Sequence, residues 1–130
     1  MNKVMVVKEF TFDSAHFLPL HKGKCHNLHG HTYKLQIGIS VSRLDKNGMV
    51  IDFADLKEST NYVLENLDHK CLNEISAVGL MHGFPADCPT AEMMVIWLAE
   101  VALPKVLNPN MQIEKVRLYE TPTSYAEWGM

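Results

Sequence analysis

Cysteine is scarce in this chain, and its distribution excludes a disulfide framework. The 130 residues contain three cysteines, Cys25, Cys71 and Cys88, an odd number without paired spacing. Small secreted domains that depend on disulfides carry an even and denser set of cysteines. We therefore expect reduced thiols in a cytoplasmic protein.

The chain also lacks long apolar runs and a strong charge of either sign. No apolar stretch is long enough to span a bilayer, and the start Met1-Asn2-Lys3-Val4 lacks the apolar segment of a signal peptide. The formal net charge of -3 gives no argument for a nucleic-acid partner or for an anionic membrane surface. Because 47% of the residues are hydrophobic, we expect residues 1–130 to form a single domain with a packed core.

What the sequence does contain is a compact histidine motif. Cys25 lies four residues before His29, which is followed by Gly30 and His31. His29 and His31 are two residues apart, so both side chains lie on one face of an extended backbone. The apolar residues downstream continue in the same phase: Tyr33, Leu35, Ile37, Ile39 and Val41. The alternation predicts a strand with both histidines at its leading end, on the side that faces the core.

A third histidine ends the first predicted strand, residues 4–16. His16 has the same parity as Phe10 and is therefore expected on the core side. If this strand pairs antiparallel with the next one, its end lies beside the start of its partner, and His16 meets His29 and His31. Three neutral imidazoles can hold a zinc ion and leave a fourth position open for water or substrate.

The rest of the chain predicts two helices and two more strands. We expect helices that begin after Asp52 and Thr90, each as an N-cap, and strands over residues 112–121 and 124–128. The order strand, strand, helix, helix, strand, strand is an α+β pattern with an antiparallel sheet. Residues 93–99 are apolar nearly all round, which predicts that the second helix packs against another subunit as well as the core.

Other interpretations of the histidines stay open. Each ring could be a core histidine that is satisfied by hydrogen bonds, and Cys25 could close a structural site of three histidines and one cysteine. The matching faces of two predicted partner strands favour the open metal site.

Single candidates outside the histidine set are weaker. Cys25 alone would most often be a small apolar residue, but its loop position beside Lys24 and His26 favours a reactive thiolate. Glu120 shares its face with the apolar Leu118, which costs free energy unless the carboxylate has a partner. It is either an edge residue in water or an anchor that accepts two N–H groups of a ligand.

Together these stretches resemble the 6-pyruvoyl-tetrahydropterin synthase superfamily, and within it the branch that forms 6-carboxytetrahydropterin. The matching segments run in the family's order through nearly the whole chain: residues 10–16, 25–33, 51–57, 67–69, 89–92 and 120–121. The resemblance implies the tunnelling fold, here a four-stranded antiparallel sheet with two helices packed on one face. In that fold trimers close a barrel and two trimers stack into a homohexamer.

The resemblance also implies a site and a reaction. The implied roles are zinc ligands for His16, His29 and His31, catalysis for Cys25, Asp68 and His69, and pterin binding for Glu120 and, from a neighbouring subunit, Thr90. The implied enzyme is a zinc-dependent lyase of queuosine biosynthesis. It converts 7,8-dihydroneopterin triphosphate to 6-carboxytetrahydropterin and releases acetaldehyde and triphosphate.

Two alternative functions remain at this point. The pyruvoyl-forming synthase uses the same substrate and site, but the resemblance associates it with a longer interval between the cysteine and the histidine pair. A non-catalytic, zinc-stabilised oligomer is the second alternative. One departure from the compact bacterial pattern is the longer segment 74–88, which could alter specificity or only decorate the rim. The residues that would bind triphosphate are not evident, and Lys22 and Lys24 are candidates.

Overall fold

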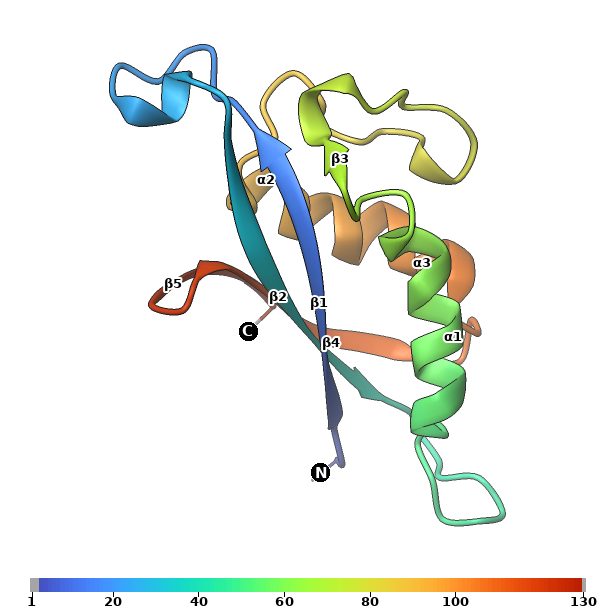
Figure 1. The fold of residues 1–130 in the computed structure, drawn as a ribbon. Coiled ribbons are helices and arrows are strands. Elements are labelled where there is room, and N and C mark those ends of the chain that lie inside the picture. The colour runs from blue at the N-terminus through green and yellow to red at the C-terminus, as the bar shows by residue number, and fades with distance from the viewer. Residues whose placement is uncertain (1–2, 130) are drawn as a thin grey trace.

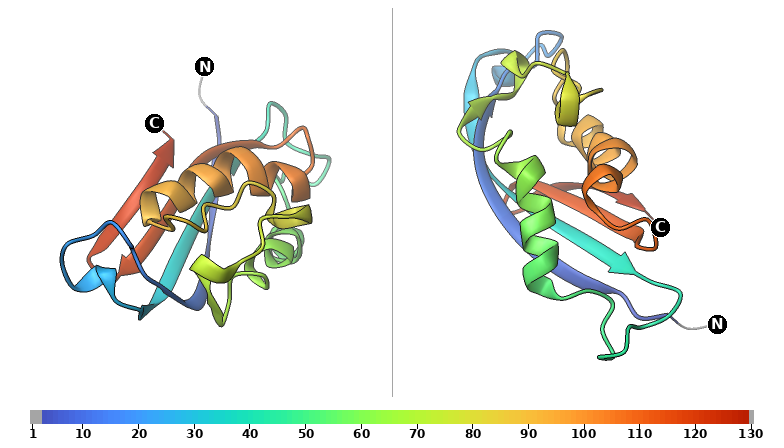
Figure 2. Two further views of the ribbon diagram at one scale, coloured as in Figure 1. Left: turned by 90° about the horizontal axis from the view of Figure 1, so that it is seen from above. Right: turned by 90° about the vertical axis from the view of Figure 1, so that its right-hand side faces the viewer.

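The computed structural model describes residues 3–129 and contains one curved sheet with helices on one face (Figures 1 and 2). The strands are β1 (Val6–His16), β2 (His29–Ser40), β3 (Lys70–Cys71), β4 (Gln112–Thr121) and β5 (Ser124–Gly129). The helices are α1 (Phe53–Leu64), α2 (Ala91–Trp97) and α3 (Leu103–Val106), with a π-helical turn at Leu98–Ala102 between the last two. Short 3-10 turns occur at Lys24–His26, Leu72–Glu74 and Gly79–Met81.

The predicted α+β class and its antiparallel core are confirmed, with one addition to the sheet. The strand order is β3-β1-β2-β4-β5, and the four long strands pair antiparallel in that order. The expected sheet had four strands, whereas β3 adds a fifth that runs parallel to β1. Because β3 has only two residues, it carries no periodicity from which the sequence could predict it.

Alternation along the strands sets the core. The inward residues of the central strands are almost fully buried: Phe10, Phe12, Tyr33, Leu35, Ile37, Ile39, Val116 and Leu118. The helices cover this face and not the other (Figure 2). Each long strand thus has an inner face that packs on the helices and an outer face that is free in the single chain.

The helix starts follow the predicted caps. The Asp52 carboxylate accepts the N–H of Ala54 at 2.8 Å, and the Thr90 hydroxyl accepts the N–H of Met93 at 3.1 Å. The π-helical turn lies directly before α3, where Pro104 supplies no N–H to a regular helix. The second helical stretch therefore changes its hydrogen-bond register there and ends two residues after Pro104.

The second helix is less enclosed in one chain than its composition predicts. Met94, Val95 and Trp97 are buried in the core, but Met93 and Ile96 are 44% and 45% exposed. Within residues 3–129 no helix is long and apolar enough to cross a membrane.

Candidate functional site

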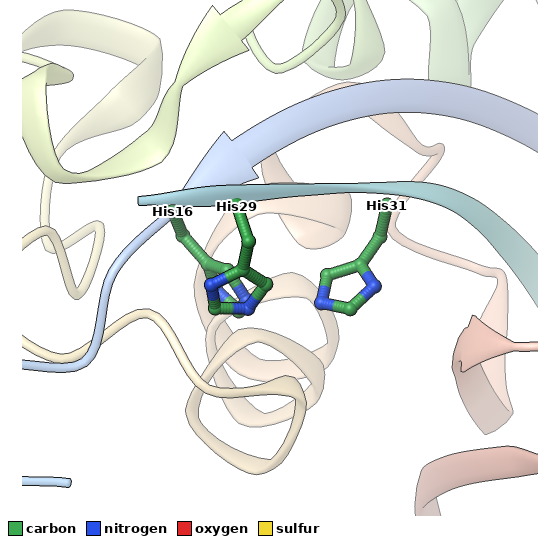
Figure 3. A group of neighbouring side chains, drawn as sticks. All are labelled: His16, His29 and His31. Atoms are coloured by element: carbon green, nitrogen blue, oxygen red, sulfur yellow. The ribbon is translucent and has the colours of Figure 1, made fainter. Parts of the chain in front are cut away.

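The pairing of β1 with β2 brings the three predicted histidines together. His16 lies directly opposite His29 in the ladder, and His31 follows two residues later on the same face. All three rings point to the helix side of the sheet (Figure 3). One ring nitrogen from each histidine lies within 4.8 Å of the other two, so the structure places three imidazole ligands around one point.

Two of these rings are held in the tautomer that a metal requires. The Nδ1–H of His16 donates to the carbonyl oxygen of Pro89 at 2.8 Å, and the Nδ1–H of His29 donates to that of Asn27 at 2.7 Å. The Nε2 atoms of both rings are then acceptors, and neither has a hydrogen-bond partner among the described residues. Buried lone pairs that converge without a donor fit a cation, and the backbone carbonyls fix the orientation of the rings.

Burial favours the neutral form of two of the three rings. Desolvation lowers the pKa of His16 and of His31, and the neighbouring imidazoles lower it further. The hydrogen bond to Pro89 raises the pKa of His16, and the carboxylate of Glu120 raises both pKa values, but these effects do not offset the burial. Neutral imidazole is the form that binds metal ions, so the residues present fit a metal centre.

Glu120 is the predicted site residue that lies closest to the cluster. Its Oε2 atom is 3.5 Å from Nε2 of His16 and 3.6 Å from Nε2 of His31. The carboxylate is 30% exposed and lines a cleft of about 490 Å³ between α2 and β5. Its contacts with His16 and His31 place it on the inner face, in line with the buried Val116 and Leu118, as predicted. It therefore faces both the cluster and the open cleft.

Cys25 is not part of the cluster in the described chain. It lies in the 3-10 turn Lys24–His26, within the loop that joins β1 to β2 (Figure 1), and is partly buried. Its carbonyl accepts the N–H of Leu18 at 2.8 Å, which closes the loop. Its sulfur is not among the ligand atoms within 4.8 Å of one another, so a site closed by Cys25 finds no support in this arrangement.

The Asp68–His69 pair lies on the opposite face of the sheet. Oδ2 of Asp68 is 2.9 Å from Nδ1 of His69. Ligand atoms of Asp68 and His69 lie within 4.8 Å of the carboxylate of Asp13, which alternates along β1 with the residues that face the helices, and the three form a group separate from the three histidines. One chain therefore does not bring this pair to the histidine cluster.

The electrostatics of that pair favour an ion pair. Hydrogen bonds from the N–H of Asp13 and from His69 lower the pKa of Asp68. The hydrogen bond to Asp68 and its charge raise the pKa of His69. Each group of the pair therefore favours the charged form of the other.

The remaining predicted residues lie around the site. Thr90 caps α2 and directly follows Pro89, whose carbonyl holds His16. Lys22 and Lys24 are exposed in the loop before the histidine pair. The segment 74–88 packs on α2, because Phe84 stacks edge-on against Trp97 and the carbonyl of His82 accepts the Trp97 Nε1–H at 3.0 Å.

Three contacts of the cluster were not predicted. They are the carbonyls of Pro89 and Asn27 and the hydroxyl of Tyr33, which is 3.4 Å from Nδ1 of His16. The two carbonyls are main-chain groups, so no residue type signals them. Tyr33 was expected on the core face, and its two-residue offset from His31 is the signal that could have linked it to the cluster.

Comparisons with known proteins agree with this arrangement. A family model described as 6-pyruvoyl tetrahydropterin synthase matches residues 5–129. A 6-carboxy-5,6,7,8-tetrahydropterin synthase from Haemophilus influenzae is 39% identical, over 95% of this chain and 96% of the relative. Proteins with the same name from Synechocystis and Rickettsia conorii are 35% and 32% identical, each over 95% of this chain and over 92% and 99% of the relative.

Solved structures show the same fold. The 6-pyruvoyl tetrahydropterin synthase of Caenorhabditis elegans superposes with a TM-score of 0.81 at 29% identity, covering 100% of this chain and 97% of that one. An uncharacterized protein from Wolinella succinogenes superposes with a TM-score of 0.78 at 21% identity, covering 99% of both chains.

The pKa of His16 predicts how metal-free protein responds to acid. Unfolded His16 takes up a proton near its ordinary pKa of 6.5, whereas burial lowers that pKa in the folded chain. Below about pH 6.5 the unfolded state therefore binds more protons, and the free energy of unfolding falls as the pH falls. Above that range neither state is protonated, and His16 adds no pH dependence. Urea unfolding of chelator-treated protein across this range measures the slope.

The matched variants are His16→Gln and His21→Gln. The first removes the buried ring and is expected to flatten the slope, although His31 still titrates. The second removes an exposed ring of the β1–β2 loop and should leave the slope unchanged. An equal slope in His16→Gln and the parent protein would contradict the assignment.

Proposed function

Because the chain belongs to the 6-pyruvoyl tetrahydropterin synthase family, we propose that it is a zinc-dependent 6-carboxytetrahydropterin synthase. It converts 7,8-dihydroneopterin triphosphate to 6-carboxytetrahydropterin, with release of acetaldehyde and triphosphate, as a lyase of queuosine biosynthesis. Relatives that carry this enzyme name are 31–39% identical over 95% of the chain. The observation that carries the proposal is the convergence of three imidazoles, two of them with free, oriented Nε2 atoms.

His16, His29 and His31 would hold the zinc ion. Their three nitrogens leave coordination positions for a ligand, as in catalytic rather than structural zinc sites. Bound zinc supplies a Lewis acid and a template for the side-chain hydroxyls of the substrate. Pro89 and Asn27 keep the rings in place before any ligand arrives, which lowers the reorganisation that binding requires.

Cys25 is the proposed general base. A thiolate in the loop beside the histidine pair can remove a proton from the side chain of the substrate. His69, held by Asp68, is proposed to shuttle a second proton, and its contact with Asp68 favours the protonated form of the ring. Glu120 is proposed to grip the pyrimidine edge of the pterin, since its carboxylate lines the cleft beside the cluster. Thr90 is proposed to line the pterin pocket of a neighbouring subunit.

A homohexamer of two stacked trimers is the proposed assembly, and the geometry of one chain supports it. The Asp68–His69 pair and the histidine cluster lie on opposite faces of the sheet, so a complete site needs residues of another copy. β5 ends the sheet, and over the described residues the outer edge of β1 is paired only at Ser14 and Ala15. Open edges favour closure by a second copy, and the exposed Met93 and Ile96 favour a covered helix.

The compartment and the alternatives follow from smaller observations. All three cysteines are free, which supports a reducing cytoplasm.

The pyruvoyl-forming synthase is the second candidate, favoured by the similarity to the Caenorhabditis elegans structure. The three residues between Cys25 and His29 favour the carboxy-forming branch, because the interval sets which carbon the thiolate reaches. A non-catalytic, zinc-stabilised oligomer would melt on metal removal, whereas an open site would lose activity first.

The first test is product analysis with the zinc-loaded protein. Dihydroneopterin triphosphate is expected to yield acetaldehyde and 6-carboxytetrahydropterin, detected by mass spectrometry. Cys25→Ala should abolish turnover and keep the zinc, because the thiol is not a ligand. Cys88→Ala, which removes an exposed thiol, is the control and should remain active. A pyruvoyl-pterin without acetaldehyde would assign the chain to the second candidate, and no turnover by intact, zinc-loaded oligomer would favour the non-catalytic one.

The second test separates two roles of Glu120. Glu120→Gln is expected to raise KM and to leave the zinc content unchanged, because an anchor loses a charge-assisted hydrogen bond. The loss of about 1.5–3 kcal/mol corresponds to roughly ten- to a hundredfold in kcat/KM. Glu127→Gln, on the same cleft, is the control. Loss of zinc in Glu120→Gln would instead make this carboxylate a metal ligand.

The third test asks whether sites are shared between copies. Cys25→Ala and His69→Gln should each be inactive as homo-oligomers. Subunits of the two variants, mixed after dissociation and reassembled, should regain part of the activity, because some sites then combine an intact Cys25 with an intact His69. Reassembled oligomers of proven mixed composition that stay inactive would contradict a shared site.

A further inference from the structure

Asp13, a residue outside the proposed catalytic set, forms main-chain hydrogen bonds to both Asp68 and His69. The main-chain N–H of Asp13 donates to Oδ1 of Asp68 at 2.9 Å. The main-chain N–H of His69 donates to the carbonyl oxygen of Asp13 at 2.5 Å. Asp13 thus holds the carboxylate of Asp68 through its own N–H and the backbone of His69 through its own carbonyl oxygen.

His69 needs such a hold because of its backbone. Its φ angle is 58°, and it is the one described non-glycine residue with a positive φ. A residue with a Cβ atom adopts this left-handed conformation only when its surroundings determine it. The conformation turns the chain from α1 into β3, and it carries the His69 ring to the outer face of the sheet beside Asp13.

The side chain of Asp13 also faces this pair. Asp13 and Thr32 are partners in the β1–β2 ladder, and the Thr32 hydroxyl donates to Oδ1 of Asp13 at 2.5 Å. One ionisable atom each of Asp13, Asp68 and His69 lies within 4.8 Å of the others. The hydroxyl therefore fixes a second carboxylate near the imidazole.

We infer that Asp13 is a positioning residue for the proposed proton shuttle: its main chain orients Asp68 and His69, and its carboxylate helps to keep the His69 ring protonated. The catalytic role of Asp13 rests on the proposed function. Its effect on the protonation of His69 does not, because that effect involves only residues of this chain.

The charges around His69 agree with that role. Asp68 contributes most to the raised pKa of His69, and the charge of Asp13 raises it further. The other titratable residues that line this cleft of about 520 Å³ are Lys70 and Cys71 of β3 and His31 of β2, whose ring points to the helix side of the sheet (Figure 3). Lys70 is the cation among them, but the charges that act on His69 are those of Asp68 and Asp13. A second fixed carboxylate therefore adds to the effect of Asp68.

Asp13→Asn removes the negative charge of the side chain and leaves the hydrogen bonds of residue 13 in place. Asparagine keeps the shape, both main-chain hydrogen bonds and an Oδ1 acceptor for Thr32, so a purely structural role predicts no change. We expect the titration midpoint of His69 to move to lower pH, measured by NMR of the intact zinc-loaded protein with ¹³C-labelled histidine. The His69 signal is assigned by its absence in His69→Gln. The limb of the kcat–pH profile that belongs to His69 should move in the same direction.

Two variants complete the test. Glu9→Gln removes a carboxylate from the same strand and the same outer face, where it contacts Gln36 and Lys34, and should leave the midpoint unchanged. Asp13→Glu keeps the charge and should retain most of the upward shift. An unchanged midpoint in Asp13→Asn, or an equal decrease in Glu9→Gln, would overturn the inference. If the parent protein does not turn over the substrate, the proposed function fails, while the NMR midpoint still decides the role of Asp13.

Discussion

The register between β1 and β2 is the constraint on which the site depends. It sets His16 opposite His29 and leaves His31 one inward position further along. A slip of one residue would turn every inward side chain of one strand outward, together with its histidine. The packing prevents that slip, because Phe12 stacks on Tyr33 at 4.9 Å and the residues below them are buried under the helices. Each such apolar side chain contributes about 1.5–3 kcal/mol. The packing of the apolar core thus fixes the strand register that brings the three histidines together.

The same sheet presents different chemistry on its two faces. The three imidazoles lie under the helices, and the Asp68–His69 pair lies on the outer face, held by the strand that carries His16. β1 therefore serves both faces: His16 points inward, and Asp13, three residues earlier, points outward. An enzyme that needs both groups in one site must bring the outer face of one chain to the inner face of another. Assembly would then be a condition for catalysis and would also close the open strand edges.

The sequence predicts those features that follow from alternation. Period-two patterns show which face a residue occupies, so they identified the inward placement of His16, His29, His31 and Glu120. These patterns do not show how far apart two residues lie on the outer face, or which residues of two chains meet. The two-residue strand β3 has no period, and the hold of Asp13 on His69 uses main-chain groups that every residue carries. For the same reason the carbonyls of Pro89 and Asn27 could not be predicted. These contacts depend on three-dimensional proximity rather than on residue type.

Zinc K-edge X-ray absorption of the zinc-loaded protein tests the central claim most directly, because it reads the donor atoms around the metal. The arrangement of the three rings predicts a first shell of nitrogen and oxygen only, with the multiple-scattering signature of imidazoles, and the same spectrum in Cys25→Ala. A sulfur ligand in the parent protein that is lost in Cys25→Ala would contradict the open three-histidine centre and would make the site a structural one closed by Cys25.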